Sequence, residues 1–437
     1  MSVWFIGQFL AAQSLLDKLN AGENNSTKSF HTDFSSFVRG VSYLGKTDDH
    51  SSTEFKSLYG DASFRLKSGF GGFGKAFAEA RLYKGLEFDQ DKQSISLREA
   101  WVEFYAGNLT VNMGQQIIVW GKADGINPTN NITPVNTILR TPDPDDQRMG
   151  NFLMSMSYRF TPSVRLEGIW VPKYKASLLP WQFSELPEGI NLKEGIYPDA
   201  KLENGSFALK LNLDFSAVDA SLSWFNGFGL NPGLTLGVPD ILPDQSMIQN
   251  IITKAYRIQV AGIDFSTSLG KFGIRGEAAW QIPFEDYEKE IYVPNPDLWY
   301  VFGIDRSFGN FQLIAQYLGR HVIDFNELIP PMDEEEQLIY GIEQGNRMFQ
   351  MQQNEWSHSL SVRASQSMLY ETLNIEVFSL MHFTTDEYMM IPKITYSISD
   401  GLSIAAGMEW YSGGENTLYD LIENPFNSVF LQLKAFF

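Results

Sequence analysis

Residues 207–215 read FALKLNLDF, and this stretch decides the fold class of the chain. Its apolar positions are Phe207, Leu209, Leu211, Leu213 and Phe215, and the positions between them are Ala208, Lys210, Asn212 and Asp214. Successive side chains of a strand point to opposite sides, so the alternation predicts one apolar face and one polar face. A tilted strand of about nine to eleven residues is long enough to cross a bilayer.

The same period of two recurs along the rest of the sequence. Further examples are residues 75–82, 154–160, 274–281 and 402–410, each with one apolar side and one side that carries charges. A soluble β-sandwich also alternates, but it does not need membrane-crossing length in nearly every strand. The sequence therefore predicts an all-β fold, a transmembrane antiparallel barrel of about 18 strands, with 16 strands as the alternative.

Composition supports this class and excludes several others. The 437 residues include 52 acidic and 33 basic side chains, a net charge of −19, and no cysteine. The acidic balance argues against a nucleic-acid partner, and the lack of cysteine excludes zinc fingers, iron–sulfur clusters and disulfides. A mean hydropathy of −0.18, without any run of about 18 apolar residues, excludes a helical membrane protein.

Aromatic residues make up 14% of the chain, and several fall near the ends of the alternating stretches. Tryptophan and tyrosine are typical of the interfacial belts of membrane barrels, because their rings are apolar and their N–H or O–H groups stay hydrated. We therefore predict belt positions for Tyr83, Tyr105, Trp120, Trp170, Trp224, Trp299, Trp356 and Trp410.

The connections between strands alternate between short and long. Tight turns are predicted at 106–108, 161–163, 308–310 and 399–401. Long connections are predicted at 121–150, 172–203, 226–250, 284–296, 322–353 and 412–425. Outer-membrane barrels have short periplasmic turns and long extracellular loops, which gives the orientation.

The N-terminal region has a different character. Residues 3–12 (VWFIGQFLAA) resemble the end of a secretory signal, although a basic start is missing. We expect a truncated signal segment at 1–12, a periplasmic or plugging segment at 13–33, and the barrel at 34–437. The alternative is an apolar helix that continues past residue 12 and plugs or caps the fold.

The final strand carries a resemblance of its own. Residues 428–437 (SVFLQLKAFF) alternate and end in Phe437. This resembles the C-terminal signature of bacterial outer-membrane proteins, which implies recognition by the barrel-assembly machinery through Phe437. It also implies residence in the outer membrane of a Gram-negative bacterium.

The connection at 121–150 is the candidate for a pore constriction, because a long third loop can fold into a barrel and narrow it. Opposed charges across a constriction create a transverse field that orients polar solutes. The candidate lining residues are Lys122, Asp124, Arg140, Asp143, Asp145, Asp146 and Arg148. The alternative is a loop that covers the mouth with solvated charges.

Charged residues of the polar parity predict a hydrated lumen wall, in which opposite charges pair across strands. The wall residues are Arg65, Lys75, Glu79, Arg81, Arg159, Lys210, Arg275, Glu277, Arg363 and Glu409. Four phenylalanines share the inward parity and are the candidates for an apolar patch in the lumen: Phe77, Phe225, Phe430 and Phe436.

No enzyme or metal centre can be assembled from the sequence. The five histidines lack metal-ligand spacing, and no nucleophile elbow or phosphate-binding loop is present. His358 shares the apolar parity of Leu360 and Val362, which predicts a place on the outer surface near a strand end. We predict no catalysis, no cofactor and no bound metal.

The stretch 114–136 (GQQIIVWGKADGINPTNNITPVN) resembles the signature of a large family of Gram-negative outer-membrane proteins that carry a domain of unknown function. The family pattern is Gly-x-Gln, then Trp-Gly, then Asn-Pro in the next loop. The matching residues here are Gly114, Gln116, Trp120, Gly121, Asn127 and Pro128. The resemblance implies a porin-like barrel, and members are suspected of moving hydrophobic compounds or lipids alongside inner-membrane exporters.

The leading prediction is an outer-membrane porin for passive or substrate-selective diffusion of small solutes. The alternative is a conduit for hydrophobic compounds or lipids, working with an inner-membrane exporter, and a third is an adhesive barrel with a plugged lumen. The expected partners are outer-membrane lipids, lipopolysaccharide, small solutes and a homotrimer of the chain, without nucleic acid.

Overall fold

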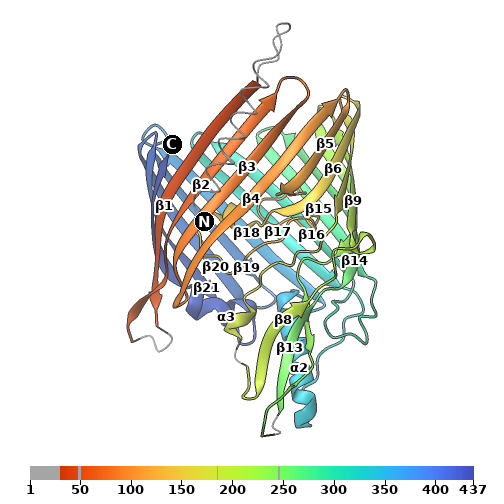
Figure 1. Ribbon diagram of the computed structural model, residues 1–437. Coiled ribbons are helices and arrows are strands. Elements are labelled where there is room, and N and C mark those ends of the chain that lie inside the picture. The colour runs from red at the N-terminus through yellow and green to blue at the C-terminus, as the bar shows by residue number, and fades with distance from the viewer. Residues whose placement is uncertain (1–29, 48–50, 185, 245–246) are drawn as a thin grey trace, which may run out of the picture.

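The computed structural model describes residues 30–437 except 48–50, 185 and 245–246, and these residues form a closed barrel (Figure 1). Eighteen of the described strands make one antiparallel sheet. The sheet closes because β1 pairs with β22, from Phe37 opposite Phe436 to Gly45 opposite Ser428. The predicted fold class and the predicted number of strands are confirmed.

The barrel strands follow one another around the wall in chain order. They are β1 (Phe30–Lys46), β2 (Thr53–Phe70), β3 (Gly74–Glu87), β4 (Gln90–Ala106), β5 (Leu109–Gln116), β6 (Asn151–Thr161), β7 (Val164–Val171), β9 (Ser206–Asp214), β10 (Val218–Phe228), β14 (Arg257–Leu269), β15 (Phe272–Pro283), β16 (Asp297–Phe308), β17 (Phe311–Val322), β18 (Trp356–Met368), β19 (Leu373–His382), β20 (Glu387–Ser399), β21 (Leu402–Ser412) and β22 (Ser428–Phe436).

The long connections carry the remaining elements. A small sheet beyond the barrel contains β8 (Ile190–Ile196), β11 (Gly233–Leu236), β12 (Asp240–Ile241) and β13 (Met247–Lys254). The helices are α2 (Glu334–Phe349), α3 (Leu418–Phe426) and the short 3₁₀ helices η1 (Pro144–Gln147), η2 (Trp181–Phe183) and η3 (Leu202–Asn204). No helix among the described residues is long and apolar enough to span a membrane.

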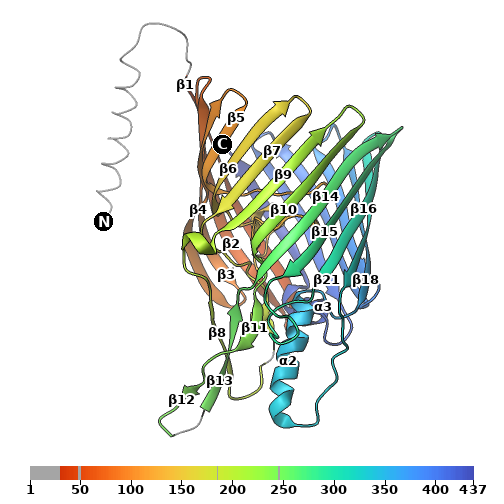
Figure 2. The same ribbon diagram turned by 90° about the vertical axis from the view of Figure 1, so that its right-hand side faces the viewer.

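The two ends of the barrel differ as the sequence predicts. All six predicted long connections are present and gather at one end, while the short turns lie at the other end together with the start of β1 and the C-terminus (Figures 1 and 2). The small sheet and α2 project beyond the barrel at the loop end (Figure 2).

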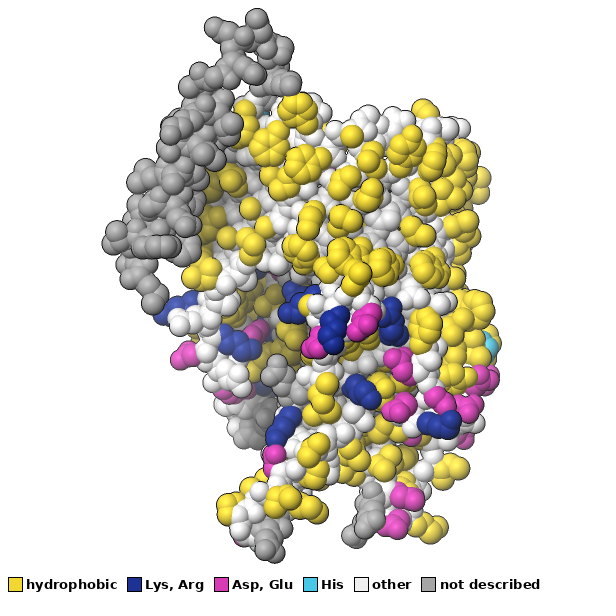
Figure 3. Space-filling model, turned by 45° about the vertical axis from the view of Figure 1, so that its right-hand side comes forward, with side chains coloured by type: hydrophobic (Ala, Val, Ile, Leu, Met, Phe, Trp, Pro, Cys, Tyr) yellow, Lys and Arg dark blue, Asp and Glu magenta, His cyan; other side chains and the backbone are white. Residues whose placement is uncertain are grey.

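The alternating pattern separates a lipid-facing surface from the lumen. In β9, Leu209 is 46% exposed on the outside, whereas its neighbour Lys210 is 6% exposed and points inward. Figure 3 shows hydrophobic side chains covering the half of this face nearer the short turns, with charged side chains toward the loops. Because the outward-facing side chains are apolar, lipid can surround the barrel without removing hydration water from polar side chains.

The predicted aromatic belt is only half right. Trp170, Trp224, Trp356 and Trp410 have the outward parity of their strands. By contrast, Tyr83, Trp120 and Trp299 lie on the lumen side, and Tyr105 lies beside an inward-facing carboxylate, that of Glu103. A position near a strand end does not reveal which face a ring occupies, because that depends on parity.

Strand β1 begins at Phe30, before the predicted start of the barrel at residue 34. The predicted segment 1–12 and most of the predicted segment 13–33 lie outside the described residues. His358 lies on the outer surface as predicted, where Nδ1 is 2.6 Å from the hydroxyl of Tyr317.

A charge on the outer surface should destabilise the barrel. We expect Leu209→Arg to lower the free energy of unfolding in lipid vesicles by about 2–4 kcal/mol, because the guanidinium would face hydrocarbon. The matched control is Leu236→Arg in β11, outside the barrel, which should change it little. Equal effects in urea titrations of the two variants would contradict the assigned membrane face.

Candidate functional site

The chain between β5 and β6, residues 117–150, leaves the wall and crosses the lumen. We call it the crossing loop. It contacts β15, β17 and β18 on one side of the barrel and β1, β3, β21 and β22 on the other. Four anchors, each built around a charged side chain, hold it in place.

The first anchor is the carboxylate of Glu277 on β15, which is 4% exposed. It accepts hydrogen bonds from the backbone N–H groups of Lys122 (3.0 Å), Ala123 (3.2 Å) and Thr129 (2.8 Å). The Thr129 hydroxyl (2.8 Å) and the Asn127 side-chain amide (3.2 Å) donate two more. One carboxylate therefore satisfies five donors of a segment that has no strand partner, and we call this arrangement the Glu277 clasp.

The family-like motif residues build this clasp. Gly121 has a φ of +107°, and a side chain there would collide with the Glu277 carboxylate and the Asn127 amide. The Asn127 amide also donates to the carbonyl of Ala123, which closes the turn, and Pro128 is buried beside it. The motif therefore specifies a loop whose donors bind the carboxylate of Glu277 on β15.

The first half of the motif lies at the end of β5, where the chain leaves the wall. A side chain at Gly114 would collide with the carbonyl of Ala100 on β4, so the strands approach closely there. The Gln116 amide lies 3.4 Å from the carbonyl of Leu153, and Trp120 is buried with the ammonium of Lys210 5.4 Å from its ring centre.

The second anchor joins the tip of the crossing loop to β17 and β18. The backbone of Asp124 exchanges two hydrogen bonds with the Gln316 side chain, at 2.7 and 2.9 Å. The carboxylate of Asp124 lies 2.8 Å from Nε of Arg363. Ile126 packs against the buried apolar side chains of Val301 and its neighbours, so this tip is held by both polar and apolar contacts.

The third anchor is Arg140, which is 1% exposed. Its guanidinium lies 3.0 Å from Glu409 on β21 and donates to the Ser428 hydroxyl (2.6 Å) and the Phe426 carbonyl (2.7 Å). It also lies over the ring of Tyr43, 4.6 Å from its centre. An arginine sandwiched and paired in this way fixes the crossing loop where the barrel closes.

The fourth anchor is Asp146 in η1. One carboxylate oxygen lies 2.7 Å from Arg39 on β1, and the other lies 2.7 Å from Arg81 on β3. Asp61 and Glu79 complete the cluster by pairing with the same two arginines. Burial alone would raise the pKa of Asp146, but the two guanidinium groups outweigh it and lower that pKa to about 2.

The other predicted lining residues are less enclosed. Asp145 and Arg148 form an ion pair at 2.8 Å, and Asp143 caps η1. The Lys122 side chain is half-buried, although its backbone belongs to the Glu277 clasp. A pore-lining role for the seven predicted residues stays a prediction; three of them, Asp124, Arg140 and Asp146, are paired directly with wall residues.

The predicted wall residues point inward and mostly form ion pairs across strands. The pairs are Lys75 with Glu103, Lys210 with Asp264, Arg275 with Asp305, and Arg65 with Glu79. Arg159 lines a cavity near the short turns. Of the predicted apolar patch, Phe225 and Phe430 are buried, Phe77 stacks near Trp101, and Phe436 is 45% exposed.

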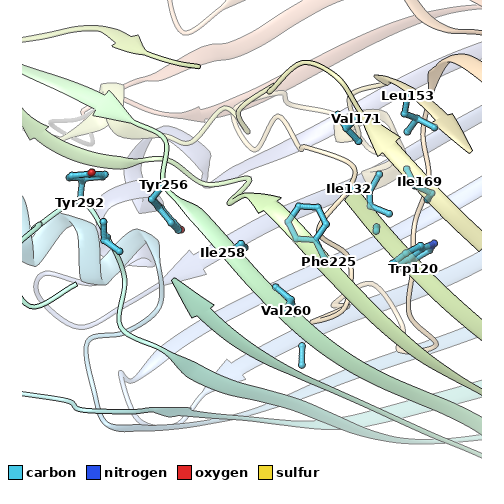
Figure 4. Close-up of a cluster of buried hydrophobic side chains, with 13 residues drawn as sticks. Trp120, Ile132, Leu153, Ile169, Val171, Phe225, Tyr256, Ile258, Val260 and Tyr292 are labelled. Carbon is cyan, nitrogen blue, oxygen red and sulfur yellow. The ribbon is translucent and has the colours of Figure 1, made fainter. Parts of the chain in front are cut away.

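Apolar side chains fill the lumen on the side of β6, β7, β10 and β14. Trp120 and Ile132 of the crossing loop lie beside Ile169 and Phe225 of the wall (Figure 4). Leu153, Ile258 and Val260 belong to the same buried cluster. The loop is therefore packed against the wall as the core of a soluble protein would be.

Two of the cavities in the described part of the molecule lie toward opposite ends of the barrel, and no residue lines both. One, of about 1160 Å³, is enclosed by the long loops and by α2 and α3. The other, of about 670 Å³, lies near the short turns and contacts Gln116 and Ile117 at the start of the crossing loop. Among the residues described, no group of three histidine or acidic side chains could hold a metal ion.

The comparisons with known proteins agree with this geometry. Residues 30–287, more than half of the chain, match the family described as "Protein of unknown function (DUF1302)". The chain belongs to the DUF1302 family. No curated protein matches the sequence.

Solved structures resemble this DUF1302 protein in fold. Pseudomonas aeruginosa OccK5 (OpdH) matches with a TM-score of 0.52 and 10% identity, covering 93% of this chain and 97% of its own. Acinetobacter baumannii OccAB4 matches with a TM-score of 0.54 and 10% identity, covering 95% and 100%. Acinetobacter baumannii OccAB3 matches with the same score and identity, covering 93% and 99%. At this identity, the likeness shows a porin-like barrel and nothing finer.

Removing the clasp carboxylate should free the crossing loop. We expect Glu277→Ala to accelerate trypsin cleavage after Lys122 about tenfold or more, since each buried donor left without a partner costs about 1–3 kcal/mol. The matched control is Glu103→Ala, an inward carboxylate whose partners Lys75, Tyr105 and Asn112 lie on β3, β4 and β5. Equal cleavage rates in the two variants would contradict the clasp.

Proposed function

We propose that the protein is a selective outer-membrane channel for apolar or amphipathic small molecules, closed at rest by its crossing loop. The observation that carries this proposal is the anchoring of the loop to both walls, between a loop-end cavity with many apolar lining residues and a polar cavity near the short turns. A general diffusion pore needs a continuous hydrated path, and in this proposal the anchored loop interrupts that path at rest.

The cavity under the long loops supports the choice of substrate. Its lining includes Phe88, Phe183, Leu338, Ile342 and Phe349. Its lining also includes charged groups, Lys56, Asp89 and Asp420 among them. Ligand sites of this kind, apolar with a few polar groups, favour molecules that have an apolar body and a polar end.

The outer membrane of a Gram-negative bacterium is the proposed location, because the barrel presents an apolar outer surface and resembles outer-membrane porins. Lipids and lipopolysaccharide would then surround it. Recognition by the assembly machinery through Phe437 and a homotrimer in the membrane are further proposals from the sequence. Phe437 is 75% exposed, and its backbone bonds to Ser36 of β1.

Diffusion of small polar solutes is the second candidate. The cavity near the short turns favours it, because that cavity is lined by Lys75, Glu103, Arg159, Arg165 and Glu167. Polar solutes would pass if the crossing loop moved away from its anchors. Such a protein would still be gated rather than permanently open.

Filling the apolar cavity should abolish ligand binding without disturbing the barrel. Gly341 lines the cavity, and a side chain there would meet open space, so Gly341→Trp should occupy it. We expect nanodisc-embedded wild-type protein to bind 8-anilinonaphthalene-1-sulfonate and this variant to bind it at least tenfold more weakly. Fluorescence above that of empty nanodiscs measures the binding.

The matched control is Ile339→Trp on the exposed side of the same helix, where the side chain is 41% exposed. It should bind the dye like the wild type. Dye binding that is unchanged in Gly341→Trp, or absent from the wild type, would contradict an apolar ligand site.

A further inference from the structure

Strand β4 has one edge that is only partly paired. Along its first edge it pairs with β3 from Gln90 to Phe104. Along its second edge it pairs with β5 only from Ala100 to Ala106. Among the described residues, no strand borders the second edge of residues 90–98, and Figure 1 shows β4 continuing past the end of β5.

Both faces of this unpaired stretch are open. Ile95 and Leu97 are 84% and 49% exposed, and they share the outward parity of Leu82 and Ala80, their partners on β3. Ser96 is exposed as well, although it pairs with the inward-facing Arg81. β5 ends before it reaches this flank of β4, so the stretch marks an interruption between β4 and β5.

An unpaired strand edge is expensive at membrane depth. Each backbone polar group without a partner in hydrocarbon costs several kcal/mol, and barrels avoid this cost by closing. The apolar pair Ile95 and Leu97 continues the outward series of Val102 and Phe104, which places the interruption beside lipid. Such an edge is tolerated at membrane depth only where it is buried in protein or lines a water-filled cavity.

The crossing loop closes the interruption from inside. The Arg98 guanidinium donates to the carbonyl of Asp145 in η1, and the Gln115 amide donates to the carbonyl of Arg98 (3.2 Å). The fourth anchor holds η1 in this position through Asp146. The same loop that crosses the lumen therefore also contacts β4 at Arg98, at one end of the unpaired stretch.

A groove on the outer surface leads to this place. It has a volume of about 590 Å³, and its apolar lining includes Val38, Ala62, Leu82 and Ile95. Its polar lining residues include Lys84, Gln93, Ser94 and Asp61, of which Asp61 is paired with Arg39. Lys84 lies on β3 toward the loop end, beyond the apolar residues. Apolar walls with a cationic end match an acyl chain that carries an anionic headgroup.

We propose that the interruption between β4 and β5 is a lateral portal through which an anionic acyl-chain amphiphile passes between the outer leaflet and the lumen, with η1 as its shutter. This inference rests on the proposed function, since it supplies the route for an amphipathic substrate. The groove holds the chain while Lys84 pairs with the headgroup, and release of η1 opens the path inward.

The test places a fluorophore inside the portal. Because the chain has no cysteine, Ser96→Cys can be labelled uniquely with bimane in the folded protein in lipid vesicles. We expect brominated stearate to quench this label several-fold more strongly than a label at Ser155→Cys. Ser155 also faces the lumen, but it lies in β6 behind fully paired strands.

A second substitution tests the headgroup. Lys84→Glu should weaken quenching by brominated stearate several-fold and leave quenching by a neutral brominated alkane unchanged. Equal quenching at residues 96 and 155 would overturn the portal, as would a label at residue 96 that is shielded because a second copy covers the edge. An unchanged response in Lys84→Glu would overturn the anionic headgroup. These readouts need neither transport nor dye binding, so they fail independently of the proposed function.

Discussion

The crossing loop can be buried inside the barrel only if its backbone polar groups find hydrogen-bond partners there, and the rest of the structure depends on this constraint. A segment without strand partners must still satisfy its backbone N–H and C=O groups, because unpaired polar groups away from water are costly. Glu277 meets this requirement for the turn at residues 121–129 by accepting five hydrogen bonds. Once that turn is fixed, the rest of the crossing loop reaches the opposite wall at Arg140 and Asp146.

In the proposed function, these anchors hold the channel closed at rest. Arg140 and Asp146 join the crossing loop to β1, β3 and β21, next to the pair of strands that closes the sheet. The loop-end cavity and the polar cavity near the turns share no lining residue. In the proposed function, a molecule that passes must bind the protein well enough to compete with the ion pairs that hold the crossing loop. This requirement would make the channel selective.

The local alternation of apolar and polar residues was enough to predict the fold, whereas the sequence did not show which residues bind one another across the lumen. The alternation in residues 207–215 predicted which side of β9 faces lipid, because parity is a property of the strand alone. Tyr83 has the parity of the inward-facing Arg81, which decides its face whatever its distance from the strand end. Trp120 lies beyond the end of β5, in the crossing loop, where strand parity does not apply. Glu277 was predicted as a wall residue, but its partners at 122–129 depend on a loop path that no spacing encodes.

Planar-bilayer recording of the purified wild-type protein tests the central claim most directly. If the anchored loop closes the lumen, we expect no steady current under a salt gradient, and only brief, small conductance events. A steady ohmic current, of the size expected for an open barrel of 18 strands, would contradict the claim that the crossing loop keeps the passage shut.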